Sequence, residues 1–376
     1  MSWVYRRLIR PVLFSQDSEF VHEKTLELLG WAGHRAILCD LIASWRRAPK
    51  LPVKVCGLEF CNPIGLAAGM DKAGEAVPVW EAMGFGFCEL GGVTWQPQPG
   101  NARPRMFRVQ RTEALINRMG FNNPGAAEMA ARLQDWRLRG LWPTHPVGVN
   151  LGKSKDTPLT QAAEEYARSL QVLLPYANFF VVNVSSPNTP NLRQLQNRSC
   201  LEEIFQALEE VQGTRESSDD AEAGRSLVKP IFIKVSPDLS FSAFDEILEL
   251  TETHAVAGLI ATNTTTFRRL SGHPEVDRPY SENGGLSGRP LRVRSTEVIR
   301  HLAKQTRGRL PIIGVGGVFC ADDAWEKIIA GASLIQIYTG LVYEGPGIVQ
   351  EILLGLQERL NQCGFTMISE AVGIDA

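Results

Sequence analysis

The chain has 376 residues, and its 39 lysines and arginines nearly balance its 41 aspartates and glutamates, which gives a formal net charge of −2. Hydrophobic residues make up 44% of the sequence and charged residues 21%. This balance excludes an intrinsically disordered chain, which combines low hydrophobicity with high net charge. It also argues against a nucleic-acid binder, which needs a clear basic excess to neutralise phosphates.

The N-terminal segment 1–14 is expected to lie at a membrane surface. It combines three arginines with tryptophan, tyrosine, phenylalanine and aliphatic side chains, a mixture that suits the boundary between lipid headgroups and acyl chains. It has neither the long apolar core nor the small-residue cleavage site of a signal peptide. No run in the chain approaches the roughly 18 apolar residues of a transmembrane span.

Two helices are expected next. Ser18 is a plausible N-cap of the first helix, Gly30 and Gly33 break its apolar pattern, and a second helix covers 35–45. Together with the terminal segment they form a predicted membrane-associating helical module over residues 1–48, although the two helices could also simply pack on the main domain.

The remainder, residues 49–376, shows a regular rhythm of short apolar runs separated by helical patterns. The apolar runs are 62–70, 86–94, 147–153, 179–187, 230–237, 256–265, 310–318 and 333–340. The helical patterns between them include 125–139, 162–174, 241–254 and 322–330. Because each run is apolar enough to be buried on both faces, the pattern predicts an α/β fold, a parallel (β/α)8 TIM barrel.

Two polar segments interrupt the rhythm. Residues 213–226 are predicted to form a mobile insertion. Residues 268–283, directly after the sixth run, could be a lid over a site or a surface loop, and the sequence favours neither.

Chemically reactive side chains gather where the apolar runs end, which is the active-site end of a (β/α)8 barrel. Lys72 follows the first run and Ser186 the fourth, while Lys234 lies inside the fifth. Taken alone, Lys72 could be a surface residue and Ser186 could simply bind backbone. Lys234 is costly to bury unless it faces a negative partner.

Asparagines and glycines complete the pattern. Asparagines recur in the loop 117–123 and at the ends of the third, fourth and sixth runs. Their amides both donate and accept, so they can bind a planar heterocycle, although asparagine also forms turns. Glycines cluster at 284–288 and 314–317, where barrels commonly bind phosphate. The second cluster is no Rossmann fingerprint, because Phe319 takes the place of its third glycine.

These motifs, in this order, resemble dihydroorotate dehydrogenase. The stretches that carry the resemblance are NPIGLAAGMDKAGE, PQPGNARPRMFR, LINRMGFNNPG, GVNLGKSKDT, NVSSPNTPNLR, IKVSPDL, ATNTT, GGLSGRPL, IIGVGGV and LIQIYTG. Ser186 and the N-terminal module resemble the membrane-associated, quinone-using class of the family. The soluble class has a cysteine as its base and lacks the module.

The resemblance implies an FMN enzyme that oxidises (S)-dihydroorotate to orotate in pyrimidine synthesis, with Ser186 as catalytic base. The expected FMN contacts are Ala68, Gly69, Met70, Asp71, Lys72, Gly92, Asn150, Asn183, Lys234, Thr262, Gly288, Gly317, Tyr338 and Thr339. The expected dihydroorotate contacts are Lys72, Asn117, Arg118, Met119, Gly120, Phe121, Asn183, Asn188, Asn263 and Thr264. The expected quinone contacts are His22, Arg108 and Tyr338.

One position departs from the family pattern. The chain has Gly92 where the family usually carries a threonine or serine. A hydrogen bond to the flavin is therefore expected to be lost or replaced by water, at a net cost of about 0.5–1.5 kcal/mol.

The resemblance also implies partners and a location. We expect a membrane quinone as electron acceptor, a peripheral position on the cytoplasmic side of the cell inner membrane, no nucleic acid, no metal, and a monomer or weak homo-oligomer. Two alternatives stay open: a soluble-type dihydroorotate dehydrogenase that uses fumarate or NAD, and a non-catalytic barrel that binds FMN or another phosphorylated ligand.

Overall fold

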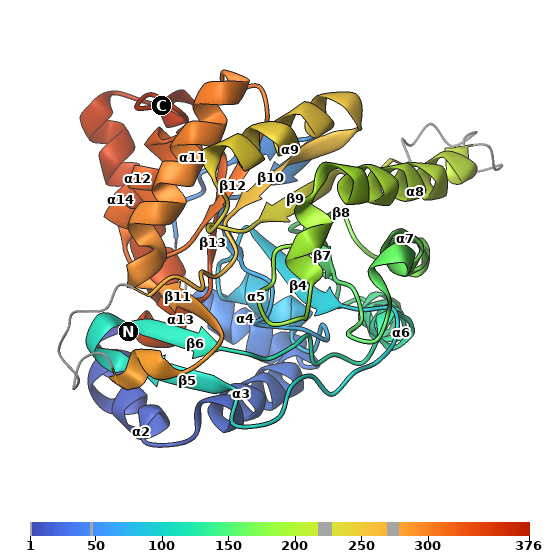
Figure 1. Cartoon of the computed structure of the whole chain (residues 1–376). Helices are drawn as coiled ribbons and strands as arrows, with labels where there is room; N and C mark the ends of the chain where they lie inside the picture. The colour runs from blue at the N-terminus through green and yellow to red at the C-terminus, as the bar shows by residue number, and fades with distance from the viewer. Residues whose placement is uncertain (1, 46–47, 217–227, 269–277) are drawn as a thin grey trace.

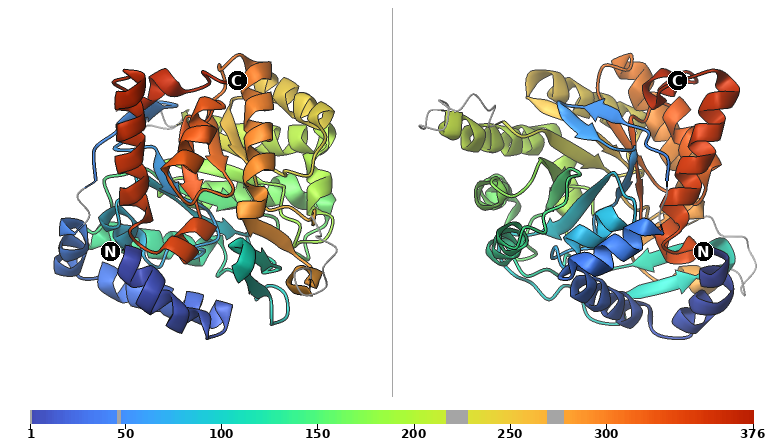
Figure 2. Two further views of the ribbon diagram at one scale, coloured as in Figure 1. Left: turned by 90° about the vertical axis from the view of Figure 1, so that its left-hand side faces the viewer. Right: turned by 180° about the vertical axis from the view of Figure 1, so that it is seen from behind.

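A computed structural model describes residues 2–45, 48–216, 228–268 and 278–376. Eight strands close into a barrel in the order β10-β12-β13-β3-β4-β7-β8-β9, and every neighbouring pair is parallel. Helices surround this barrel, and the N-terminal helices lie at the end opposite the C-terminus (Figures 1 and 2).

The barrel strands fall inside the predicted runs. They are β3 Ile64–Leu66, β4 Phe87–Val93, β7 Val147–Leu151, β8 Phe179–Asn183, β9 Ile231–Val235, β10 Val256–Ala261, β12 Ile312–Val315 and β13 Leu334–Ile337. Each of the eight runs contains one strand, so the predicted (β/α)8 barrel is confirmed. The strands are shorter than the runs because each run also includes the loop residues that follow its strand.

The surrounding helices follow the strands in turn. They are α5 Val77–Ala82, α6 Ala126–Leu138, α7 Ala162–Leu173, α8 Arg198–Glu216, α9 Phe241–Thr253, α11 Arg292–Thr306, α12 Ala321–Ile329, α13 Thr339–Glu344, α14 Ile348–Cys363 and α15 Ile368–Ala371. Short 3-10 turns are η2 Gln110–Thr112, η3 Leu159–Gln161, η4 Leu192–Gln196, η6 Arg278–Ser281 and η7 Arg289–Leu291. All four predicted helical patterns coincide with helices, namely α6, α7, α9 and α12.

Glycine–phenylalanine pairs fill the interior of the barrel. Gly65 stands opposite Phe87, Gly148 opposite Phe179, and Gly258 opposite Phe232 on neighbouring strands. The rings of Phe87 and Phe179 have centroids 6.3 Å apart, and those of Phe179 and Phe232 are 5.7 Å apart. The missing side chains leave room for the rings, which pack as a layer across the barrel.

The N-terminal module consists of α1 Ser2–Val4, η1 Tyr5–Ile9, α2 Arg10–Phe14, α3 Ser18–Gly33 and α4 Ala36–Ser44. The middle of its first helix, η1, is a π-helix. Pro11 lies two residues after its end, and a proline inside a helix cannot donate to the carbonyl four residues earlier and clashes with it. The wider turn at this point therefore has a local cause.

Two details of the predicted module were wrong. The N-cap of α3 is Asp17 rather than Ser18, because the Asp17 carboxylate accepts the backbone N–H groups of Glu19 and Phe20. The helix also continues through Gly30 to Gly33. Added Cβ atoms would lie 2.9 Å from the Glu75 carbonyl at Gly30 and 3.2 Å from a methyl of Val79 at Gly33. These glycines allow α3 to approach the barrel closely.

Two small antiparallel sheets lie outside the predicted barrel. One pairs β1 Val53–Val55 with β2 Leu58–Phe60. The other has the order β11-β6-β5 and is built from β5 Met106–Val109, β6 Ala114–Asn117 and β11 Gly285–Gly288. The second sheet joins the loop after β4 to the segment after β10. Most of the 213–226 insertion and part of the 268–283 loop lie outside the described residues.

Candidate active site

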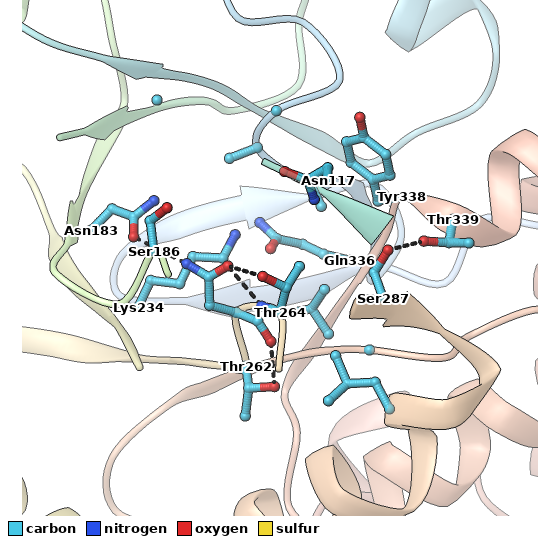
Figure 3. A pocket seen from close by; sticks show the side chains of 18 of the residues that line it. Asn117, Asn183, Ser186, Lys234, Thr262, Thr264, Ser287, Gln336, Tyr338 and Thr339 are labelled. Atoms are coloured by element: carbon cyan, nitrogen blue, oxygen red, sulfur yellow. Dashed lines mark hydrogen bonds between the residues drawn. The ribbon is translucent and has the colours of Figure 1, made fainter. Parts of the chain in front are cut away.

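A pocket opens at the carboxyl ends of the barrel strands and collects most of the predicted site residues (Figure 3). The predicted residues that line it are Ala68, Gly69, Lys72, Gly92, Asn117, Met119, Gly120, Phe121, Asn183, Ser186, Asn188, Lys234, Thr262, Asn263, Thr264, Gly288, Gly317, Tyr338 and Thr339. The residues that line it without having been predicted include Ser287, Gly316, Gln336 and Gly340.

Close packing of glycine and phenylalanine shapes one wall of the pocket. An added Cβ at Gly92 would lie 2.5 Å from Cε1 of Phe121 and 3.0 Å from Oδ1 of Asn150. At Gly152 it would lie 3.1 Å from Cζ of the same ring. The ring of Phe121 therefore fills the space that a side chain at residue 92 would need. Phe121 itself is held in the left-handed region at φ 52°.

A chain of asparagine amides runs from the barrel interior into the pocket. Nδ2 of Asn150 donates to Oε1 of Glu89 over 2.6 Å, and Nδ2 of Asn183 donates to Oδ1 of Asn150 over 2.9 Å. Nδ2 of Asn263 then donates to Oδ1 of Asn183 over 3.2 Å, and the backbone N–H of Thr264 donates to Oδ1 of Asn263 over 2.7 Å. Four strand ends thus share one hydrogen-bonded network.

Glu89 is the negative partner that a buried Lys234 requires. Its carboxylate is fully buried on β4, and Nζ of Lys234 lies 3.5 Å from its Oε1. Nε2 of Gln336 donates to Oε2 of the same carboxylate. Oε1 of Gln336 has no partner among the described residues, although the residue lines the pocket. An unpaired buried acceptor of this kind favours a ligand that donates a hydrogen bond.

Ser186 lies in the loop after β8, where it both lines the pocket and forms a hydrogen bond with the backbone. It lines the pocket and is only 9% exposed. Its Oγ also accepts the backbone N–H of Asn188 over 3.3 Å. Nδ2 of Asn188 in turn donates to Oδ1 of Asn117 over 3.0 Å. The hydroxyl is therefore fixed by the backbone while it faces the pocket, and Asn183 lies on the same side of the pocket in Figure 3.

Three predicted contact residues, namely Lys72 and Tyr338 of the pocket lining and His22 of α3, have shifted pKa values. Burial, and then the charge of Arg105, lowers the pKa of Lys72 to about 8. Burial, and then the charge of Lys72, lowers the pKa of His22 to about 3. Burial raises the pKa of Tyr338 to about 12. At neutral pH His22 and Tyr338 are therefore uncharged, and Lys72 is mostly a cation.

The glycine-rich side of the pocket packs against α11, and α12 in turn forms hydrogen bonds with α11. An added Cβ at Gly317 would lie 2.6 Å from Cβ of Arg292, so this loop packs directly on the start of α11. Ser295 Oγ donates to the Gly316 carbonyl over 3.2 Å. Fully buried Lys327 donates to Ser295 Oγ and, over 3.1 Å, to Thr296 Oγ1. Burial lowers the pKa of Lys327 to about 7.

The structure places four of the predicted FMN and dihydroorotate contact residues away from the pocket lining. Asn150 is fully buried, and its amide joins Glu89 to Asn183. Asp71 is fully buried, and its carboxylate accepts the N–H groups of Glu75, Ala76 and the Trp80 indole. Met70 belongs to the hydrophobic core. Arg118 turns outward, and its Nη1 lies 2.7 Å from Oε2 of Glu282.

Arg108, a predicted quinone contact on β5, holds the first N-terminal helix. It stacks over the ring of Phe14 with 4.6 Å to the centroid and donates to the Gln16 carbonyl over 2.8 Å. The same helix is fastened to the barrel because Tyr5 donates to the Val342 carbonyl over 2.7 Å. The module thus packs against the pocket end of the barrel.

The residues of the pocket suit a flavin mononucleotide. A flat ring system with alternating donors and acceptors matches the amide network and the unpaired Oε1 of Gln336. A phosphate matches glycine backbone together with the hydroxyls of Ser287 and Thr339, which are 2.8 Å apart. Lys234 supplies a positive charge on the same side of the pocket as Asn183 and Ser186, away from Ser287 and Thr339 (Figure 3).

The fold and the site define a (β/α)8-barrel enzyme whose pocket is lined by glycines on one side and by asparagine amides on the other. The model of the dihydroorotate dehydrogenase family matches residues 50–360. The chain belongs to this family, as the sequence predicted.

Relatives resemble the chain over nearly its whole length. A dihydroorotate dehydrogenase (quinone) from Synechocystis sp. is 51% identical, with 99% of this chain and 97% of that protein covered. One from Gloeobacter violaceus is 49% identical, with 98% of both covered. A crystal structure of the Eimeria tenella enzyme in complex with ferulenol superposes with a TM-score of 0.85 at 34% identity, covering 97% of this chain and 98% of that one.

Proposed function

We propose that the chain is a quinone-dependent dihydroorotate dehydrogenase, which binds FMN and oxidises (S)-dihydroorotate to orotate in pyrimidine synthesis. The observation that carries the proposal is that Ser186, Lys72 and a set of asparagine amides face the same glycine-lined pocket. Membership in the family and the names of the relatives support it.

FMN supplies the hydride acceptor of the reaction when it is bound. Lys234 provides a positive charge for the negative charge that arises on reduction, and Glu89 holds this lysine in place. Gly288, Gly317 and Thr339 would hold the phosphate, and Thr262 and Gly69 would lie against the ring system, since all five line the pocket.

Ser186 Oγ removes the proton from C5 of dihydroorotate. A serine is a weak base, so the C5 proton must be made more acidic by its surroundings. Asn117, Asn188 and Asn263 hold the pyrimidine ring by its carbonyl and N–H groups. Lys72, a cation below about pH 8, binds the carboxylate and polarises the carbonyl next to C5.

The N-terminal module admits the quinone and contacts the bilayer. Its exposed apolar side chains include Trp3 at 65%, Val12 at 66% and Ile37 at 81% exposure. An apolar hollow lies where the module meets the barrel, and it is lined by Val4, Tyr5, Ile9, Trp45 and Pro346. Among the described residues no helix is both long and apolar enough to cross a bilayer. These features support peripheral binding to a bilayer. The proposal takes this bilayer to be a bacterial inner membrane, with the protein on its cytoplasmic side.

Anaerobic reduction of the bound flavin by dihydroorotate tests the reaction. The purified protein should lose its flavin absorption on addition of dihydroorotate and regain it with a quinone. Regain with fumarate or NAD instead would identify the soluble type of enzyme. A flavin that never bleaches would leave a non-catalytic FMN barrel.

A Ser186 variant tests the base. Ser186→Ala should bind FMN normally but reduce it about 10²–10⁴-fold more slowly, which is the usual contribution of a general base. Ser186→Cys, which keeps a proton acceptor at the same place, is the matched control and should retain more of the rate. Near-normal reduction by the alanine variant would refute the assignment.

A further inference from the structure

We infer that Glu89 is a positioning residue that turns the Gln336 amide so that its oxygen, and not its nitrogen, faces the flavin. The inference rests on the proposed FMN site and deepens it. Glu89 itself does not line the pocket and acts through the side chains that it holds.

The first step is the hydrogen-bonding capacity of Glu89. Its carboxylate accepts hydrogen bonds from Asn150 on β7 and Gln336 on β13 and forms an ion pair with Lys234 on β9. A carboxylate that faces a lysine accepts hydrogen bonds and donates none. Each amide that touches it must therefore turn its NH₂ group toward it.

The second step is what this orientation leaves for the ligand. Gln336 is 1% exposed, and because its NH₂ group faces Glu89, its Oε1 faces away and remains without a partner among the described residues. A buried acceptor without a partner is costly unless a ligand donates to it. The pocket thus selects a ligand with a ring N–H at this level, which an oxidised flavin has.

The third step shows that Glu89 does not control the rest of the network alone. The asparagine chain from Asn150 to Asn263 ends on the backbone N–H of Thr264, a group that can only donate. That end keeps Asn183 and Asn263 in the same orientation without help from Glu89. Loss of the carboxylate should therefore disturb the Gln336 and Lys234 side and spare the dihydroorotate side.

Glu89→Gln separates these two sides. One end of the new amide can still accept from Asn150, but the other end presents NH₂ to the NH₂ of Gln336, which must turn over. We expect FMN affinity to fall about 10- to 100-fold, the range for a buried hydrogen-bonding group that is left without its partner. Orotate affinity of the FMN-saturated protein should change by no more than about twofold, as for sites that do not share partners.

The measurements are quenching of FMN fluorescence for cofactor affinity and perturbation of the flavin absorption band by orotate. Glu165→Gln is the matched control. It also neutralises a buried carboxylate, one that accepts from Ser154 and Trp95 and touches no residue of the pocket. Equal losses of FMN affinity in both variants, or equal losses of FMN and orotate affinity in Glu89→Gln, would overturn the inference.

Gln336→Met provides an independent test because it removes the amide and keeps Glu89. It should also lose FMN affinity, and adding Glu89→Gln to it should cost less than in the natural chain. Unchanged FMN affinity in Gln336→Met refutes the inference even when Glu89→Gln fails to fold. The proposed function fails by a different result, namely an unaltered flavin spectrum when dihydroorotate is added to the natural protein.

Discussion

Replacing Gly92 by threonine tests whether the missing hydroxyl or the ring of Phe121 governs this position. An added Cβ would lie 2.5 Å and 2.7 Å from Cε1 and Cδ1 of the ring and 3.0 Å from Oδ1 of Asn150. Carbon atoms in contact normally stay about 3.5–4.0 Å apart. Because the same ring lies against Gly152, it has little room to retreat.

The two effects can be compared in magnitude. A hydroxyl restored at residue 92 would gain about 0.5–1.5 kcal/mol through a hydrogen bond to the flavin. Overpacking a filled site costs about 1–3 kcal/mol. The steric cost exceeds the gain from the hydrogen bond, so Gly92→Thr should lower the free energy of unfolding and weaken FMN binding, although it restores the residue that is usual in the family.

The assay is urea unfolding of the FMN-loaded protein together with the FMN dissociation constant. Gly213→Ala serves as control, because an added Cβ there meets no atom within 4 Å. In a Phe121→Ala background the penalty of Gly92→Thr should shrink, since the clashing ring is gone. A Gly92→Thr protein that is as stable as the natural one and binds FMN more tightly would refute the steric argument.

Three further predictions concern the membrane, the substrate and the glycine-rich side of the pocket. The double variant Trp3→Ser, Val12→Ser should bind anionic vesicles less tightly and reduce quinone more slowly, while flavin reduction by dihydroorotate is unchanged. The control Leu138→Ser, at a 79% exposed position on α6, should change neither vesicle binding nor quinone reduction. Orotate affinity should be constant below pH 8 and fall about tenfold per pH unit above it, because Lys72 with its pKa of about 8 then loses its charge; a flat profile would contradict its role. The pKa of Lys327 is lowered to about 7 in the folded protein, whereas an unfolded lysine has a pKa of about 10.4. Between these two pH values the unfolded chain therefore binds one more proton at this residue than the folded one. Unfolding free energy should therefore rise by about 1.4 kcal/mol per pH unit between these values, and Lys327→Met should remove that rise in urea titrations.

The sequence was sufficient for the barrel because its strands are buried on both faces. Continuous apolar runs such as 179–187 stand out from the helical patterns around them, and polar side chains at their ends must meet at one end of a parallel barrel. This is why the sequence alone assigns Ser186, Asn183 and Lys234 to one pocket, and all three line it.

Other features of the structure could not be predicted from any local pattern in the sequence. The sheet of β5, β6 and β11 pairs short strands that are distant in sequence, such as Leu286 with Ile116, and these strands do not belong to long continuous apolar runs like those of the barrel. The direction of Arg118 depends on Glu282, which is 164 residues away along the chain. Glu89 could have been noticed as a charged residue inside an apolar run, which is the same argument that drew attention to Lys234.

The glycine–phenylalanine layer inside the barrel also constrains how this sequence can change over generations. An added Cβ at Gly65 would lie 2.3 Å from the ring of Phe87, and one at Gly148 would lie 2.1 Å from the ring of Phe179. In each pair a larger residue can enter on one strand only after the neighbouring ring has become smaller. Gly258 differs, because the backbone carbonyl of Pro311 lies 2.4 Å from its added Cβ. The first two positions can therefore drift as coupled pairs, while the third is fixed as glycine as long as the backbone keeps its course.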